Sequence, residues 1–255
     1  MRPLLSMSLP IVVGLACAGA ARAQGGPPMI TDDPGTPGPG NWEINIAATT
    51  VRSSPGSESE LPLVDINYGV GERIQLKYEV AWLAQRVEGE HSRSGFSNSL
   101  LGVKWRFHDT GENLWRISTY PQIELRNPRS HSVRRGLAED GRRVLLPIEV
   151  ERDFANVGVN FEVGRELDSR GDDTWLGGIV LGHSFSPNLE LMTELHGESS
   201  GSTRESQIAA NFGARITVAG AGTLLVSAGR DLHNRLEDRS GFFGYLGWQR
   251  LSEVE

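Results

Sequence analysis

Several serine and histidine side chains could do nucleophilic chemistry if they met. His183 is followed by Ser184 and Ser186, and His196 lies further along the chain. A hydroxyl nucleophile needs its base within hydrogen-bond reach, but adjacent residues of a strand point to opposite faces. The run Gly197–Gly201 spells G-x-S-x-G, yet no helical pattern follows it, as a nucleophile elbow requires. We therefore expect no catalytic residues and interpret these side chains as groups of the rim and loops.

Acidic side chains gather at two places where a cation could bind. Asp168, Asp172 and Asp173 share one polar segment, and Asp32 and Asp33 are adjacent. Calcium prefers several carboxylates on a flexible loop, but neither set has EF-hand spacing, and turn formation explains acidic residues beside glycine. The histidines lack the spacing of zinc ligands. We therefore favour the turn interpretation over a bound ion and expect no metal and no cofactor.

Charged side chains at alternating positions are more informative. In a strand every second residue faces the same side, so these charges would line the interior of a closed sheet. Two interpretations stay open: a field across a water-filled lumen would orient polar solutes, whereas paired charges would fill and close the interior. The predicted lumen residues are Lys77, Lys104, Arg106 and Arg116 in a basic arc, and Glu149, Glu151, Glu162, Glu190 and Glu194 in an acidic arc.

These positions require strands, and period-two alternation runs through the chain from Trp42 onward. Apolar Ile74 and Leu76, for example, alternate with polar Gln75 and Lys77. Such alternation is typical of a strand with one apolar and one polar face. It recurs in about twelve segments of roughly ten residues, the length of a tilted strand that crosses a bilayer. The predicted fold class is all-β: a transmembrane antiparallel up-and-down β-barrel of about 12 strands.

The connections between these segments alternate between long and short. Outer-membrane barrels have long external loops and short periplasmic turns in this order, whereas alternation of side chains alone also fits a soluble sheet. Long connections are expected at 52–60, 84–96, 126–143, 168–173, 197–204 and 231–240, and short ones at 69–72, 108–113, 153–156, 184–188 and 217–222.

All tryptophans fall at or near the ends of predicted strands, on the apolar parity. Tryptophan prefers the headgroup level of a bilayer, where its ring is apolar and its N–H reaches water. We therefore predict an aromatic girdle of Trp42, Trp105, Trp115 and Trp248 toward the periplasmic rim, and Trp82 and Trp175 toward the outer rim.

The first 23 residues have the pattern of a secretory signal peptide. Arg2 precedes a mostly apolar run, Leu9–Ala20, and an A-x-A site, Ala21–Ala23. Cleavage there would leave Gln24 first and remove the single cysteine, Cys17. Processing as a lipoprotein at Cys17 is the less favoured alternative. The predicted organisation is a signal peptide at 1–23, a Gly/Pro-rich periplasmic lead-in at 24–41, a barrel at 42–249 and a short acidic tail at 250–255.

Charge and hydropathy exclude other classes. The net charge of -7 and the lack of a basic stripe argue against nucleic-acid binding. After the signal peptide, no run approaches the roughly 18 apolar residues of a spanning helix. A mature membrane protein of this sequence must therefore be a closed barrel, because lipid cannot satisfy free backbone groups.

Two short motifs resemble a known family. One is Met29–Pro34 followed by Asn41-Trp42-Glu43, and the other is Val64–Val70 followed by Leu76–Glu79. They resemble the outer-membrane transporter family named after the meta-pathway of phenol degradation. The resemblance implies a transport-type barrel for small molecules, including aromatic or apolar ones, and no catalytic residues. The chain departs from the common barrel habit of a final aromatic residue, because Trp248 is followed by 249–255.

We therefore predict a channel or transporter of the bacterial outer membrane. Its expected partners are outer-membrane lipid, a small-molecule solute and the barrel-assembly machinery, with no nucleic acid. The alternatives are a closed barrel with a structural or adhesive role, and a soluble periplasmic β-barrel binding protein.

Overall fold

A computed structural model describes residues 25–54, 56–111, 115–127, 130–154, 157–201, 206–235 and 240–252. The signal peptide expected at 1–23 lies outside these residues, as do the last three residues of the expected tail. Within the described ranges, no helix is long and apolar enough to cross a membrane.

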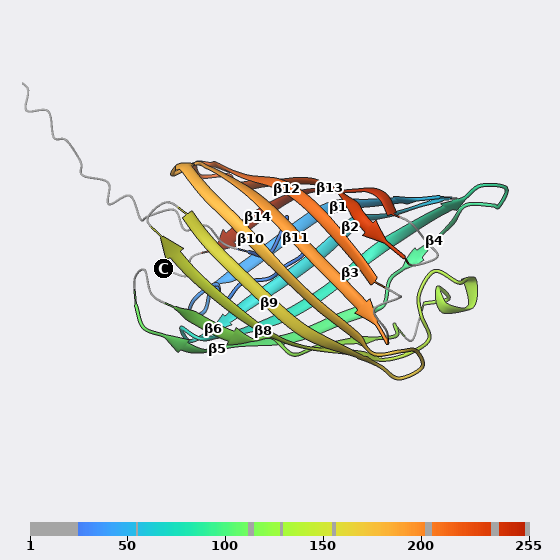
Figure 1. Cartoon of the computed structure of the whole chain (residues 1–255), viewed down its shortest axis with the longest axis horizontal. Coiled ribbons are helices and arrows are strands. Elements are labelled where there is room, and N and C mark those ends of the chain that lie inside the picture. The colour runs from blue at the N-terminus through green and yellow to red at the C-terminus, as the bar shows by residue number, and fades with distance from the viewer. Residues whose placement is uncertain are drawn as a thin grey trace, which may run out of the picture.

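The described residues form 14 strand segments, which join in a single antiparallel sheet (Figure 1). One short 3-10 helix, η1 (Val133–Arg135), lies in the connection between β7 and β8. The strands are β1 (Trp42–Ser53), β2 (Gly56–Val70), β3 (Ile74–Val87), β4 (Arg93–Phe96), β5 (Ser99–Asp109), β6 (Arg116–Thr119), β7 (Gln122–Leu125), β8 (Arg143–Phe154), β9 (Val157–Asp168), β10 (Thr174–Ser186), β11 (Leu189–Ser200), β12 (Ser206–Val218), β13 (Gly222–Asn234) and β14 (Ser240–Ser252).

The sheet closes on itself as a barrel of 12 spans. Both β4 and β5 pair with β3, and both β6 and β7 pair with β5 and β8, so each couple is one interrupted span and 14 segments make 12. Pro121 stands in the second interruption, where it lacks an N–H to donate. The first span pairs with the last along its whole length, from Trp42 opposite Ser252 to Ser53 opposite Ser240. The predicted fold class is confirmed.

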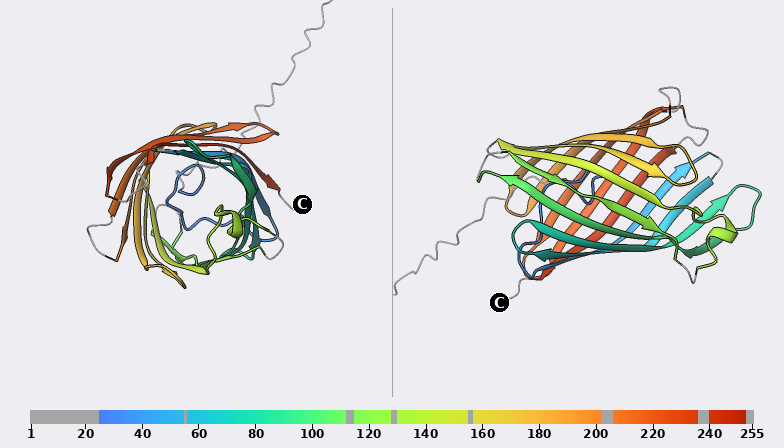
Figure 2. Two further views of the ribbon diagram at one scale, coloured as in Figure 1. Left: turned by 90° about the vertical axis from the view of Figure 1, so that its right-hand side faces the viewer. Right: turned by 90° about the horizontal axis from the view of Figure 1, so that it is seen from below.

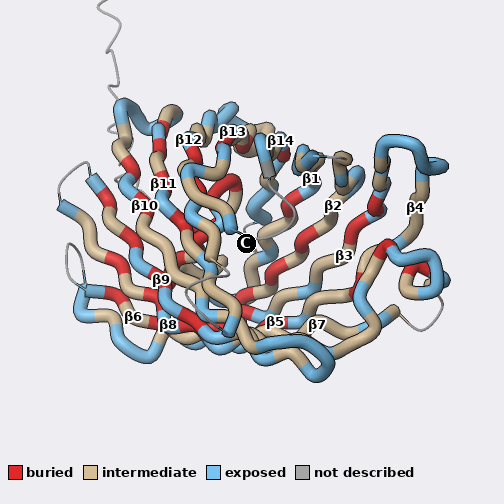
Figure 3. Tube along the Cα trace, turned by 45° about the vertical axis from the view of Figure 1, so that its right-hand side comes forward, coloured by how far each residue is buried: buried red, intermediate tan, exposed pale blue. Residues whose placement is uncertain are grey.

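Burial alternates along the strands with polar side chains inside. In β9, Asn160 and Glu162 are buried, whereas Phe161 and Val163 are exposed. Figure 3 shows this alternation of buried and exposed positions along the strands. A soluble protein buries its apolar residues instead, so the outer surface is the kind that acyl chains cover.

The six tryptophans all lie exposed near the ends of spans. Trp42 packs on Tyr68 with ring centroids 4.6 Å apart, and Trp82 meets Phe96 edge to face at 5.0 Å. Trp105, Trp115, Trp175 and Trp248 are likewise exposed.

The two ends of the barrel differ in their connections. One end, the turn end, carries the links 71–73, 187–188 and 219–221, and the other, the loop end, carries the long connection 126–142. The prediction of a long loop at 52–60 is wrong, because β1 and β2 remain paired as far as Ser53 and Gly56. The polar residues of this region extend the β1–β2 hairpin. Polar side chains are as compatible with a strand exposed to water as with a loop. The tail expected from residue 250 is also corrected, since β14 pairs with β1 through Ser252.

The segment 25–41, here called the plug segment, enters the barrel. Figure 2 shows it as the dark-blue chain inside the ring of strands. Thr31 is fully buried there. The plug segment precedes β1, which begins at Trp42, so the strands of the barrel enclose a segment that is not part of the sheet. The prediction of a periplasmic lead-in is therefore wrong for these residues. Glycine and proline exclude regular structure in the plug segment, as expected. Side chains of the lumen instead form hydrogen bonds with its backbone groups.

The outer face generates a direct test. Phe212 is 66% exposed at the middle of β12. We expect Phe212→Arg to lower the free energy of unfolding from phosphatidylcholine vesicles by about 2 to 4 kcal/mol, the cost of a cation in the apolar bilayer. Phe212→Leu is the matched control and should cost much less. Equal losses for the two variants in urea titrations would contradict lipid exposure of this position.

Candidate functional site

Two buried carboxylates hold the backbone of the plug segment. Glu194 of β11 accepts hydrogen bonds from the amides of Thr31 at 2.6 Å and Ile30 at 3.1 Å. Glu162 of β9 accepts one from the amide of Asp32 at 2.9 Å. Hydrogen bonds to a charged group are worth about 1.5 to 3 kcal/mol each. These two strands therefore fix the plug segment at the middle of the lumen.

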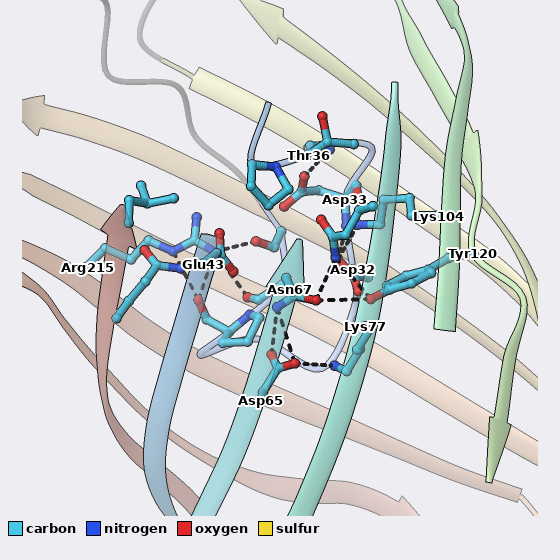
Figure 4. Close-up of a pocket in the computed structure, with 18 residues that line it drawn as sticks. Asp32, Asp33, Thr36, Glu43, Asp65, Asn67, Lys77, Lys104, Tyr120 and Arg215 are labelled. Carbon is cyan, nitrogen blue, oxygen red and sulfur yellow. Dashed lines mark hydrogen bonds and ion pairs between the residues drawn. The ribbon is translucent and has the colours of Figure 1, made fainter. Parts of the chain in front are cut away.

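A lysine ties the plug segment to the opposite wall. The Nζ atom of Lys104 lies 2.9 Å from Oδ1 of Asp32 and 3.7 Å from Oε2 of Glu149, and it donates to the carbonyl oxygen of Asp33. Figure 4 shows Lys104 beside Asp32 and Asp33 of the plug segment. Burial disfavours the Asp32 carboxylate, but Lys104 and Lys77 outweigh that effect and hold the pKa of Asp32 below its ordinary value. Burial raises the pKa of Asp33.

Arg215 of β12 holds the beginning of the plug segment. Its guanidinium donates to the carbonyl oxygen of Pro27 at 2.8 and 3.1 Å and to that of Gly26 at 3.2 Å. The same guanidinium lies 3.5 Å from the carboxylate of Glu190. Arginine offers five donors in a rigid fork, so one side chain satisfies several carbonyl groups of a segment that has no regular structure.

Glycines on the inner wall make room for the plug segment. A Cβ atom added at Gly178 would lie 1.8 Å from Oγ1 of Thr31, and one at Gly213 would lie 2.2 Å from Cε of Met29. Met29 fills that space and packs with Val180 in a small buried apolar cluster. The inner wall and the plug segment are therefore complementary in shape as well as in charge.

Other wall charges pair within their own strand or with a neighbouring strand. Arg116 contacts Glu151 at 2.5 Å and Asp153 at 2.8 Å. Lys77 contacts Glu79 at 2.8 Å and Asp65 at 3.4 Å. These pairs pack the wall without help from the plug segment.

The structure places all nine predicted lumen residues on the inner face, in one charged interior. They are Lys77, Lys104, Arg106, Arg116, Glu149, Glu151, Glu162, Glu190 and Glu194. The predicted arcs touch directly between Lys104 and Glu149 and between Arg116 and Glu151. Arg106 instead pairs with Asp109 at 3.1 Å. Within the acidic arc, Glu162 and Glu194 bind the plug segment, whereas Glu190 pairs with Arg215. The sequence did not predict the contacts with the plug segment.

Sequence reasoning missed several interior residues. Arg215, Asp65 and Tyr120 line a cavity beside the plug segment but were not among the predicted lumen residues. Arg215 could have been found, because it shares the inward parity of Asn211. Tyr120 lies in the break between β6 and β7, where alternation gives no guide.

The catalytic and metal candidates do not assemble. His183 and Phe185 form an edge-to-face pair on the outer parity of β10, whereas His196 is buried on the inner face of β11. The G-x-S-x-G run continues β11 as far as Ser200 and forms no elbow. In the described part of the chain, no group of three His, Cys, Asp or Glu residues could hold a metal ion. The Asp168 carboxylate accepts hydrogen bonds from the backbone amides of Arg170 and Gly171, as expected of a turn.

The plug segment leaves space on both of its sides. Toward the turn end lies a cavity of about 180 Å³ lined by Lys77, Lys104 and Arg215. Toward the loop end lie a cavity of about 340 Å³ against Met29 and, nearer the mouth, one of about 550 Å³ against Arg143. The lumen is thus divided rather than filled.

Comparisons of the fold point to channels of the outer membrane. The COG4313 outer membrane channel from Pseudomonas putida F1 is 12% identical, with a TM-score of 0.68, over 84% of this chain and 96% of that one. The KdgM porin is 13% identical, with a TM-score of 0.57, over 83% and 99%. The NanC porin is 8% identical, with a TM-score of 0.58, over 83% and 100%. At these identities the likeness is one of fold, and the fold it defines is the closed antiparallel β-barrel of 12 spans.

No family model matches the chain, and no curated protein matches it. These comparisons therefore support a barrel fold and assign neither the family that the two motifs resemble nor a transported solute. The similar structures are channels and porins rather than enzymes.

The buried ion pairs predict unequal effects of removing an arginine. Arg116→Gln leaves the fully buried Glu151 without its cation, so we expect a loss of about 3 to 5 kcal/mol in the free energy of unfolding. Arg165→Gln breaks an exposed pair with Asp173 and should cost about 0 to 1 kcal/mol. Denaturant titration of both folded variants measures the difference. Similar small losses would mean that water, not Arg116, solvates Glu151.

Proposed function

We propose that this protein is an outer-membrane channel for small molecules, with a lumen that the plug segment narrows. The observation that carries the proposal is the divided lumen: cavities lie on both sides of a folded segment inside a closed barrel. A purely structural barrel needs no such spaces. The exposed apolar outer face and the signal peptide expected at 1–23 support residence in the bacterial outer membrane.

The sizes of the cavities support a small solute. Sites for drug-sized molecules span about 300 to 1,000 Å³, and the cavities toward the loop end measure about 340 and 550 Å³. One similar structure is the KdgM porin in complex with disordered oligogalacturonate, a long polyanion. The plug segment and the buried carboxylates around it oppose such a substrate here. Apolar lining by Met29, Ile30 and Phe243 supports a solute with an apolar or aromatic part.

Outer-membrane lipid and the barrel-assembly machinery are the partners that this proposal requires. The apolar face would contact lipid acyl chains. Because β14 pairs with β1, the barrel closes only when its first and last spans meet, a step that the assembly machinery would assist.

Single-channel recording with a glycine variant tests the channel. In Gly178→Ala the new Cβ collides with Thr31, so the plug segment must shift. We expect a small conductance for the unmodified protein in planar bilayers and a larger one for Gly178→Ala. Gly197→Ala is the control on the neighbouring strand, because its Cβ would lie 3.4 Å from the nearest atom, an ordinary contact.

The outcomes separate the channel from a closed barrel. If all three folded proteins insert but none conducts, the barrel is a closed wall protein and the channel proposal is rejected. If Gly197→Ala raises conductance as much as Gly178→Ala does, the plug segment does not set the width of the path. Recovery of the exported protein in the soluble periplasm would reject membrane residence.

A further inference from the structure

The cavity of about 340 Å³ beside the plug segment has the composition of a binding site. Pro28, Met29 and Ile30 form one side of it, and Phe243 and Tyr245 of β14 form the wall. Ile30 is 47% exposed, although its neighbour Thr31 is fully buried. Binding sites are typically apolar cavities with a few well-placed polar groups. We call this space the loop-side chamber.

The polar groups of the loop-side chamber include two carboxylates, and one of them reaches further. Glu60 and Glu198 both line the chamber. Glu60 also lines the cavity of about 550 Å³ nearer the mouth, together with Glu58. A solute entering from the loop end therefore meets acidic side chains first and the apolar surface of Ile30 behind them.

Some acidic groups of this region are already neutralised. Glu79 lies 2.8 Å from the Nζ atom of Lys77. Arg143 contacts Glu124 at 2.9 Å and Glu139 at 3.7 Å. Arg143 is the one basic residue among those that line the mouth cavity within the described ranges. These pairs leave no excess cation to balance the remaining carboxylates.

The remaining carboxylates have no lysine or arginine partner within the described part of the chain. Glu60 accepts a hydrogen bond from Thr49 at 2.8 Å, and Glu198 lies 3.3 Å from Nε2 of His196. Among the described residues, Glu58 forms no ion pair. Partly enclosed carboxylates of one sign, next to low-dielectric walls, create a field that concentrates cations.

A buried amide adds an acceptor to the loop-side chamber. Asn211 is 1% exposed and lines the chamber, and its Nδ2 atom donates to Glu194 at 3.0 Å. Its Oδ1 atom has no hydrogen-bond partner among the described residues. Buried acceptors in proteins are normally satisfied, so Asn211 leaves a buried acceptor without a donor beside the chamber.

We propose that the loop-side chamber binds small organic cations: molecules with an ammonium group and an apolar, preferably aromatic, body. The ammonium would meet Glu60 and Glu198, and the body would lie against Ile30, Phe243 and Tyr245. Aromatic faces also attract cations. A coordinated metal ion fits less well, because the described residues hold no group of three suitable ligands. This assignment refines the solute class of the proposed channel.

Calorimetric titration of the folded, detergent-solubilised protein at low salt tests the assignment without requiring conduction. The probes are 2-phenylethylammonium, the neutral 2-phenylethanol and the anionic 3-phenylpropanoate. We expect the ammonium to bind about tenfold or more tightly than the alcohol, and the anion to bind most weakly. Glu60→Gln and Glu198→Gln should each reduce that preference, whereas Glu88→Gln, at an exposed position in the β3–β4 link, should leave it unchanged.

Each outcome decides the proposal. Equal affinities for ammonium and alcohol would overturn it, and so would an unchanged preference in both folded glutamine variants. Loss of the preference in Glu88→Gln as well would reduce it to a general effect of net charge and overturn the assigned site. Selective ammonium binding by a barrel that does not conduct would keep the site and reject only the channel.

Discussion

The structure depends on one constraint: carboxylates buried inside the barrel must be given hydrogen-bond donors. Glu149, Glu162 and Glu194 lie on the inner wall with almost no exposure. A buried charge without partners is very costly. The donors are the backbone amides of residues 30–32 for Glu162 and Glu194, and the hydroxyl of Ser118 for Glu149. Lys104 adds an ion pair with Glu149 and itself pairs with Asp32. The plug segment is therefore as much a part of the folded interior as the strands, and a segment without regular structure gains a fixed path from the charges around it.

The same constraint gives the lumen its shape. Because the plug segment crosses the middle of the barrel, the space that remains is divided into a small, highly charged cavity toward the turn end and larger ones toward the loop end. At the first cavity Lys77, Lys104 and Arg215 face carboxylates of the plug segment and the wall. At the loop-side chamber, Glu60 and Glu198 have no lysine or arginine partner among the described residues. The charges of the first cavity therefore oppose one another, whereas those of the loop-side chamber are mainly acidic. In the proposed channel, the plug segment would limit the size of a solute and the chamber would favour cations.

The barrel fold and the inward-facing positions of its strands could be predicted from the alternation of polar and apolar residues alone. In β9, the sequence 157–164 places Asn160 and Glu162 inside because every second residue shares a face. The plug segment could not be found this way, because its partners Glu162 and Glu194 lie 130 to 164 residues away and its glycines and prolines show no period. The hairpin of β1 and β2 was misread for a related reason: Ser53–Ser59 is polar, and polarity alone does not distinguish a loop from a strand that extends beyond an apolar band. Parity is local information, whereas the folding of a terminal segment into a lumen depends on complementary charge at a distance.

Hydrogen–deuterium exchange of the backbone amides, in the intact protein in lipid nanodiscs, tests the central claim most directly. If lumen carboxylates hold the plug segment, the amides of Ile30, Thr31 and Asp32 will exchange slowly, on the timescale of the amides of β11. If these three amides exchange at the rate of an unfolded peptide while the strands stay protected, the plug segment does not reside in the lumen and the account is wrong.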